Sequence, residues 1–178
     1  MVYGQKFREG IGPFFISLAE DLSLALPTLG ARRQAKARVL VPNYRLAPEH
    51  PFPAAIDDAV QAYQWLLDHG GELSKTIFAG DSAGGGLAVS TAIALRDRHL
   101  PMCAGIPPLL CVVGGDEILL DDAIRLVRNA GTAGIDATLF IAAGMQHIFA
   151  IWAGSFPEAD AAIALVGDWV RARWSCMM

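Results

Sequence analysis

Cysteine, positive charge and long apolar runs are all scarce in this 178-residue chain. Cys103, Cys111 and Cys176 are odd in number and lack metal-ligand spacing, so we expect reduced, mostly buried thiols and no metal site. Only 14 basic residues face 18 acidic ones, and the resulting net charge of −4 argues against nucleic acid as a partner. Because no uncharged apolar run is long enough to cross a bilayer, we expect no membrane span.

A secretory signal is also missing from the sequence pattern. The amino-terminal stretch has no basic segment followed by an apolar core, so we expect a cytoplasmic protein. The basic residues that do cluster, at 32, 33, 36 and 38, are not interleaved with aromatic side chains. They are typical of a solvated loop or helix end, not of a binding patch.

Apolar residues are abundant, at 53% of the chain with a mean hydropathy of +0.38. A parallel sheet covered on both faces needs near-continuous apolar strands, and residues 38–42 and 109–113 meet that need. The alternative is a core that is partly exposed and covered by another subunit. The length indicates one domain, residues 1–178, with a sizeable core.

Helix and strand patterns alternate along the chain. This alternation predicts an α/β domain with a mainly parallel sheet flanked by helices. We expect strands at 38–42, 76–79, 109–113 and 137–141, and helices at 14–26, 53–68, 87–95, 120–127 and from 157 onward, the last starting at a capping box at 155–158.

A serine stands between glycines in Gly80-Asp81-Ser82-Ala83-Gly84, with a predicted strand before it and a predicted helix after it. Strand, tight turn and helix with a serine at the apex form a nucleophile elbow, in which small neighbours make the strained turn possible. A serine in this position also has a simpler interpretation, as the cap of the helix that follows.

Two further residues complete the set that nucleophilic acyl transfer needs: an imidazole to take the serine proton and a carboxylate to orient it. Asp116 follows one predicted strand and His147 follows the last one, in the chain order serine, acid, histidine. Asp116 or Glu117 alone has an equally good interpretation as a helix cap. His50, His69 and His99 lie in a proline-rich loop or at helix ends, whereas His147 directly follows a strand.

Three motifs carry a resemblance to a known family. Residues 43–55 (NYRLAPEHPFPAA), 80–85 (GDSAGG) and 114–123 with 144–147 (GGDEILLDDA and GMQH) resemble segments of the hormone-sensitive-lipase-like α/β-hydrolases. The resemblance implies a lipase-like serine carboxylesterase that acts on short- to medium-chain esters without a cofactor. It implies a catalytic triad of Ser82, Asp116 and His147, with the Ala83 N–H as an oxyanion donor.

The sequence also departs from the family pattern. Residues 1–37 match poorly and contain no His-Gly-Gly-Gly segment, which in the family supplies oxyanion donors. Gly10-Ile11-Gly12 is a degenerate stand-in or part of a flexible loop. A strand and a helix are missing between Ser82 and Asp116, and so is the lid. In the family's strand order, the missing strands flank the nucleophile strand on both sides.

These gaps set the remaining expectations. If the sheet closed over a missing strand, Asp116 and His147 would move towards Ser82 by about 4.8 Å, unless loops or a second subunit compensated. We expect an open acyl site that favours small soluble esters, and a homo-oligomer that covers exposed strand edges. The alternative is a catalytically impaired or non-catalytic hydrolase-fold protein, either a deletion product or a ligand-binding module; thioesterase or amidase activity would use the same residues.

Overall fold

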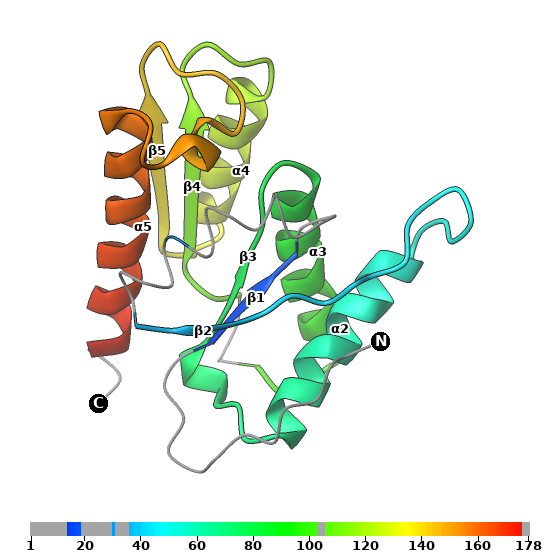
Figure 1. The fold of residues 1–178 in the computed structure, drawn as a ribbon. Coiled ribbons are helices and arrows are strands. Elements are labelled where there is room, and N and C mark those ends of the chain that lie inside the picture. The colour runs from blue at the N-terminus through cyan, green and yellow to red at the C-terminus, as the bar shows by residue number, and fades with distance from the viewer. Residues whose placement is uncertain (1–13, 19–29, 31–35, 103–105, 176–178) are drawn as a thin grey trace.

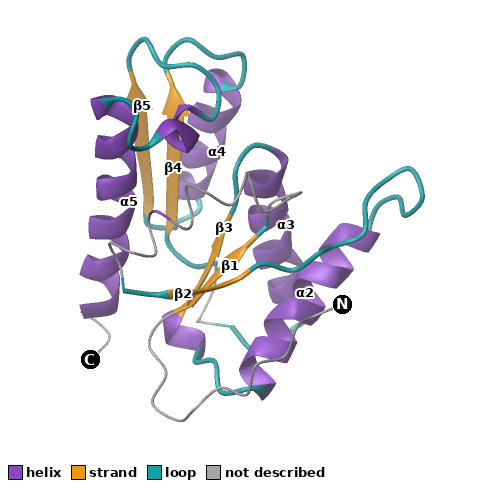
Figure 2. Ribbon diagram, in the orientation of Figure 1, coloured by secondary structure: helices purple, strands orange, loops and turns teal. Residues whose placement is uncertain are grey.

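The computed structural model describes residues 14–18, 30, 36–102 and 106–175, and its strands and helices alternate along the chain (Figures 1 and 2). The strands are β1 (Phe14–Ser17), β2 (Arg38–Leu40), β3 (Thr76–Ala79), β4 (Leu109–Gly114) and β5 (Ala137–Ala142). The helices are α2 (Ala54–Asp68), α3 (Ala83–Asp97), α4 (Leu120–Thr132) and α5 (Pro157–Ser175), with short 3₁₀ turns η1 (Leu73–Lys75) and η2 (Phe149–Trp152). The α/β class is confirmed.

The strands form two parallel groups. One has the order β2-β1-β3, and the other consists of β4 and β5 paired from Leu109↔Ala137 to Gly114↔Ala142. Within the described residues no pairing joins β3 to β4, so the sheet is interrupted between them (Figure 2). The sheet therefore does not close over the strand that the sequence lacks.

Strand β1 corrects two expectations. Residues 14–17 belong to a strand and not to a helix over 14–26, whose residues 19–26 lie outside the described part of the chain. Short apolar runs fit either structure, and here pairing with two neighbours decides the outcome. Because β1 pairs with β3 in register Phe14↔Thr76, one flank of the nucleophile strand is occupied; only the flank towards β4 lacks a strand among the described residues.

Helices cover both faces of the sheet. Successive strand residues point to opposite faces, so Ile16 packs with α2 and α3 while Phe15 packs with α5. Helix α4 packs on β4 and β5. Helix α5 contacts both strand groups, through Val170 beside β1 and through Ala159 and Ala162 beside β5 (Figure 1). One helix thus bridges the interruption.

The family-like segment at residues 43–55 projects from the body just before α2 (Figure 1). Its base is fixed by Arg45, whose guanidinium forms hydrogen bonds of 2.7 to 3.1 Å with the Asp58 carboxylate and whose backbone N–H donates to the same group at 2.8 Å. The Arg45 charge and hydrogen bonds lower the pKa of Asp58. Charge-assisted pairs of this kind also fix geometry.

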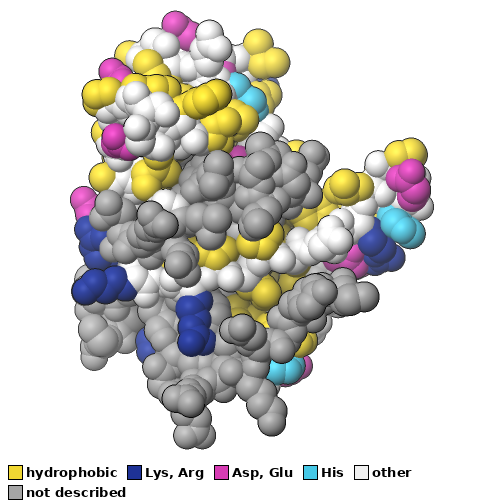
Figure 3. Space-filling view, in the orientation of Figure 1, with side chains coloured by type: hydrophobic (Ala, Val, Ile, Leu, Met, Phe, Trp, Pro, Cys, Tyr) yellow, Lys and Arg dark blue, Asp and Glu magenta, His cyan; other side chains and the backbone are white. Residues whose placement is uncertain are grey.

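Several hydrophobic side chains remain on the surface. Ile118 is 94% exposed, Phe52 85% and Trp152 58%. Figure 3 shows hydrophobic atoms gathered over the part of the molecule formed by β4, β5 and the loops that follow them. Of the three cysteines, Cys111 lies in the described residues as a half-buried free thiol, and burial raises its pKa. No helix among the described residues is long and apolar enough to cross a membrane.

Candidate active site

Ser82 lies in a strained turn between β3 and α3. Its backbone has φ 52° and ψ −119°, a conformation that costs a non-glycine residue about 1–3 kcal/mol. The side chain is exposed and makes no capping hydrogen bond to α3, which excludes the simpler interpretation of this serine as a helix cap. The turn therefore directs the Ser82 hydroxyl outward at the carboxyl end of β3.

Glycines make this turn possible. A Cβ at Gly80 would overlap the backbone of Gly84 and lie 2.8 Å from the Gly85 nitrogen. A Cβ at Gly85 would lie 3.2 Å from the Gly80 carbonyl oxygen. The two arms of the turn approach so closely that larger residues do not fit. Packing therefore requires glycine at position 80, and a side chain at position 85 would be a tight fit.

His147 joins the serine to a carboxylate. Its Nε2 lies 2.8 Å from Ser82 Oγ, and its Nδ1 lies 2.9 Å from Glu117 Oε1. An ionised carboxylate only accepts hydrogen bonds, so the proton resides on Nδ1 and the Nε2 lone pair faces the serine hydroxyl. Ser82 is thus in hydrogen-bond reach of a base that is itself oriented by an acid.

The carboxylate that contacts His147 is that of Glu117, not that of Asp116, which the sequence led us to expect as the acid. Asp116 is exposed, and its backbone N–H donates a hydrogen bond to the Met145 carbonyl at 3.0 Å. The Glu117 side chain is only 5% exposed, and its second oxygen accepts the Gly114 N–H at 2.7 Å. Neither acid caps α4, whose N-cap is Leu119.

The ends of β4 and β5 bring Glu117 and His147 together. The Gly115 N–H donates to the Ala142 carbonyl at 2.7 Å, which extends the pairing of these strands past β4. A Cβ at Gly114 would overlap the Met145 carbonyl oxygen, so glycine allows the two loops to touch. The loop after β5 therefore holds His147 over the turn after β4, as the strand-end rule predicts for parallel sheets.

Asp81, the residue before the serine, is a largely buried carboxyl group. Burial raises its pKa from 3.8 to about 6, and the nearby His147 charge opposes that rise. Among the described residues its carboxylate makes no recorded hydrogen bond, so little offsets the loss of hydration. The raised pKa of Asp81 was not predicted from the sequence.

The Ala83 N–H is a candidate oxyanion donor. Ala83 is the first residue of α3, and an N–H at the first helical position has no partner within the helix. The second candidate, Gly10-Ile11-Gly12, lies outside the described residues and precedes β1. Because β1 runs parallel to β3, its amino end lies at the edge of the sheet away from Ser82.

No cluster of three or more metal-binding side chains occurs in the described part of the chain. The site as described consists of Ser82, His147 and Glu117, with Asp81 and the Ala83 N–H beside them.

The chain is similar to known hydrolases in sequence and in fold. The alpha/beta hydrolase fold family matches residues 27–106, which include the whole nucleophile turn. An acetyl-hydrolase of Streptomyces hygroscopicus is 32% identical over 77% of this chain, and the chain spans about two thirds (66%) of that relative's length. The aligned span of 196 residues exceeds the 178 of this chain, so the relative carries residues there that this chain lacks.

Solved structures show the same fold. An esterase/lipase from an uncultured bacterium superposes with a TM-score of 0.86 at 31% identity, over 94% of this chain and 79% of its own. An esterase from the bacterial hormone-sensitive lipase family gives 0.86 at 31% identity, over 97% and 80%. The chain belongs to the hormone-sensitive-lipase family of α/β-hydrolases, a family of carboxylic ester hydrolases.

Proposed function

We propose that this protein is a serine carboxylesterase acting on short- to medium-chain carboxylic esters. The observation that carries the proposal is the continuous hydrogen-bonded series from Ser82 Oγ through His147 to the buried Glu117 carboxylate. Membership of the hormone-sensitive-lipase family supports the same reaction class.

In the first half of the reaction, Ser82 Oγ attacks the ester carbonyl carbon while His147 Nε2 takes the hydroxyl proton. The carbonyl π-electrons move onto the oxygen, and the Ala83 N–H stabilises that oxyanion. Collapse of the tetrahedral intermediate breaks the bond to the alcohol oxygen, which leaves with the proton from His147. The product is an acyl-enzyme on Ser82.

In the second half, water attacks the acyl carbonyl carbon and His147 again takes the proton. The second intermediate collapses, the carboxylic acid leaves, and the proton returns to Ser82 Oγ. Glu117 contacts neither ester nor water: it positions the imidazole and stabilises its positive charge in both halves. We therefore propose Glu117, in place of Asp116, as the acid of the triad.

The absence of a His-Gly-Gly-Gly motif sets the expected rate. Loss of a single oxyanion donor costs about 10²–10³ in turnover, so a chain with only the Ala83 N–H should be slow compared with its relatives. The competing function is a hydrolase-fold protein without catalysis. The strained Ser82 and its bond to His147 favour an enzyme, because neither feature is needed to bind a ligand.

The test is hydrolysis of p-nitrophenyl acetate and butyrate by purified wild type and Ser82→Ala. We expect wild-type turnover that falls to background in the variant. Background rates from a folded wild type would contradict the proposal. Ser90→Ala is the matched control, since Ser90 lies two turns further along the same helix and is not part of the site.

A further inference from the structure

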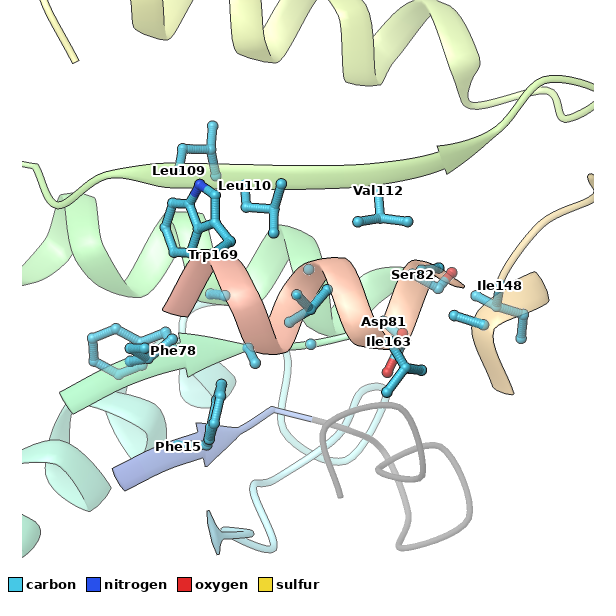
Figure 4. Close-up of a pocket in the computed structure, with 18 of the residues that line it drawn as sticks. Phe15, Phe78, Asp81, Ser82, Leu109, Leu110, Val112, Ile148, Ile163 and Trp169 are labelled. Atoms are coloured by element: carbon cyan, nitrogen blue, oxygen red, sulfur yellow. The ribbon is translucent and has the colours of Figure 1, made fainter. Parts of the chain in front are cut away.

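The interruption between β3 and β4 contains a cavity of about 280 Å³ that begins at the catalytic residues. Strands β3 and β4 form two of its walls, helix α3 a third, and helix α5 the fourth. Figure 4 shows Ser82 at one end of this space and Trp169 at the other, with β4 running along it. We call this space the strand-gap channel.

Polar groups in the channel are confined to its mouth. Asp81, Ser82, Glu117 and His147 line that end, and the remaining lining side chains are hydrocarbon or aromatic. The one polar atom at the far end, the Trp169 indole N–H, already donates to Thr138 Oγ1 at 3.3 Å. An apolar channel whose reactive groups all lie at its opening suits a ligand with one reactive end and an apolar tail.

The length of the channel follows from the strand beside it. The four residues of β3 span about 13 Å at roughly 3.3 Å per residue. An extended alkyl chain advances roughly 1.3 Å per carbon, since C–C bonds near 1.52 Å zigzag along it. The span of β3 therefore corresponds to roughly ten carbons of an extended chain.

We infer that the strand-gap channel binds the acyl chain of the substrate, so that the preferred esters carry acyl groups of about eight to ten carbons. This inference rests on the proposed function and narrows it to the medium-chain end. The gap between β3 and β4 would then be the source of the acyl specificity, because it leaves space leading away from the reacting carbon.

The wall residue Leu110 offers a direct test. Leu110 lies on β4 between Leu109 and Val112 and lines the channel (Figure 4). Leu110→Trp should fill the middle of the channel. Ile141→Trp is the matched control: it adds the same bulk to the neighbouring strand at a position that is 45% exposed and does not line the channel.

The assay is kcat/KM for p-nitrophenyl esters from acetate to hexadecanoate, below micellar concentrations. For wild type and Ile141→Trp we expect a maximum at octanoate or decanoate at least tenfold above acetate, because each buried methylene adds up to about fourfold. In Leu110→Trp the octanoate-to-acetate ratio should fall at least tenfold. A wild-type maximum at acetate, or an unchanged ratio in Leu110→Trp, would overturn the inference.

Binding separates the channel from the chemistry. Decanoate is titrated calorimetrically into Ser82→Ala and into the double variant Ser82→Ala/Leu110→Trp, neither of which needs turnover. We expect binding that weakens at least tenfold in the double variant. If decanoate binds and the double variant weakens it, but wild type hydrolyses no ester, the proposed esterase function is refuted while the channel as an acyl-chain site stands. Hydrolysis that requires Ser82, with no decanoate binding, would refute the channel and keep the esterase.

Discussion

Replacing Glu117 by glutamine removes the negative charge beside His147 while keeping the size of the side chain. The carboxylate accepts two hydrogen bonds, from His147 Nδ1 at 2.9 Å and from the Gly114 N–H at 2.7 Å. An amide has only one oxygen, so it can accept only one of these two hydrogen bonds. In the variant, either the amide NH₂ faces the N–H of Gly114 or of His147, or His147 carries its proton on Nε2, where it can no longer accept the serine proton. Both arrangements disturb the base that Ser82 depends on.

The magnitude follows from the charge. As the reaction proceeds, His147 becomes positive, and two unit charges 4 Å apart attract by about 4 kcal/mol at an effective dielectric constant near 20. Losing that attraction corresponds to a fall of about 10³ in kcat. Asp116→Asn is the matched control, because the Asp116 side chain is exposed and should change kcat less than about threefold.

The assay is ester hydrolysis by wild type, Glu117→Gln and Asp116→Asn, with circular-dichroism melts to confirm that all three fold. A large loss in Asp116→Asn together with near-wild-type turnover in Glu117→Gln would refute the assignment of the acid. It would then favour the triad that the sequence motif indicated, with Asp116 beside His147.

Three further predictions concern stability and assembly. The pKa of Asp81 rises from 3.8 in the unfolded chain to about 6 in the folded protein, so the free energy of unfolding falls as pH rises between these values. Asp81→Asn removes this effect. In urea unfolding, the variant should therefore be more stable than wild type by up to about 3 kcal/mol at pH 8 and by almost nothing below pH 4. Gly80→Ala should lower the free energy of unfolding by several kcal/mol in the same assay, since the new Cβ would overlap the Gly84 backbone. Gly86→Ala has open space around it and should raise the free energy of unfolding by about 0.5–1 kcal/mol. Equal effects of the two substitutions would contradict the packing argument. Exposed Ile118 and Trp152 support our expectation of a homo-oligomer, which light scattering at micromolar concentration tests and a monomer would contradict.

The sequence predicted the elements that carry their own local signal. Strand β3, the Ser82 turn and α3 were located from a short apolar run followed by glycines, β4 and β5 from apolar runs, and α4 from its helical periodicity. Strand β1 was missed because its four residues, Phe14–Ser17, continue into a helix-like pattern that runs to residue 26. Only its pairing with β2 and β3, which are distant in the sequence, makes it a strand.

The candidate site stays a prediction, and its geometry differs from the sequence expectation in the carboxylate, because Glu117 and not Asp116 contacts His147. Ser82 and His147 each follow a strand by a recognisable motif, and the structure brings them to 2.8 Å. Asp116 and Glu117 stand next to each other in one turn, so strand-end placement alone does not separate them. The choice is made by the Gly114–Gly115 turn, which exposes Asp116 and buries Glu117, and no local sequence signal reports that orientation.

The central claim is that this shortened chain still assembles an activated serine at Ser82. The most direct measurement is intact-mass analysis after reaction with a serine-directed fluorophosphonate, on wild type and Ser82→Ala, with peptide mapping of the adduct. The account predicts one equivalent of adduct on Ser82 and none in the variant. A folded wild type that remains unlabelled, or that is labelled equally without Ser82, would contradict it.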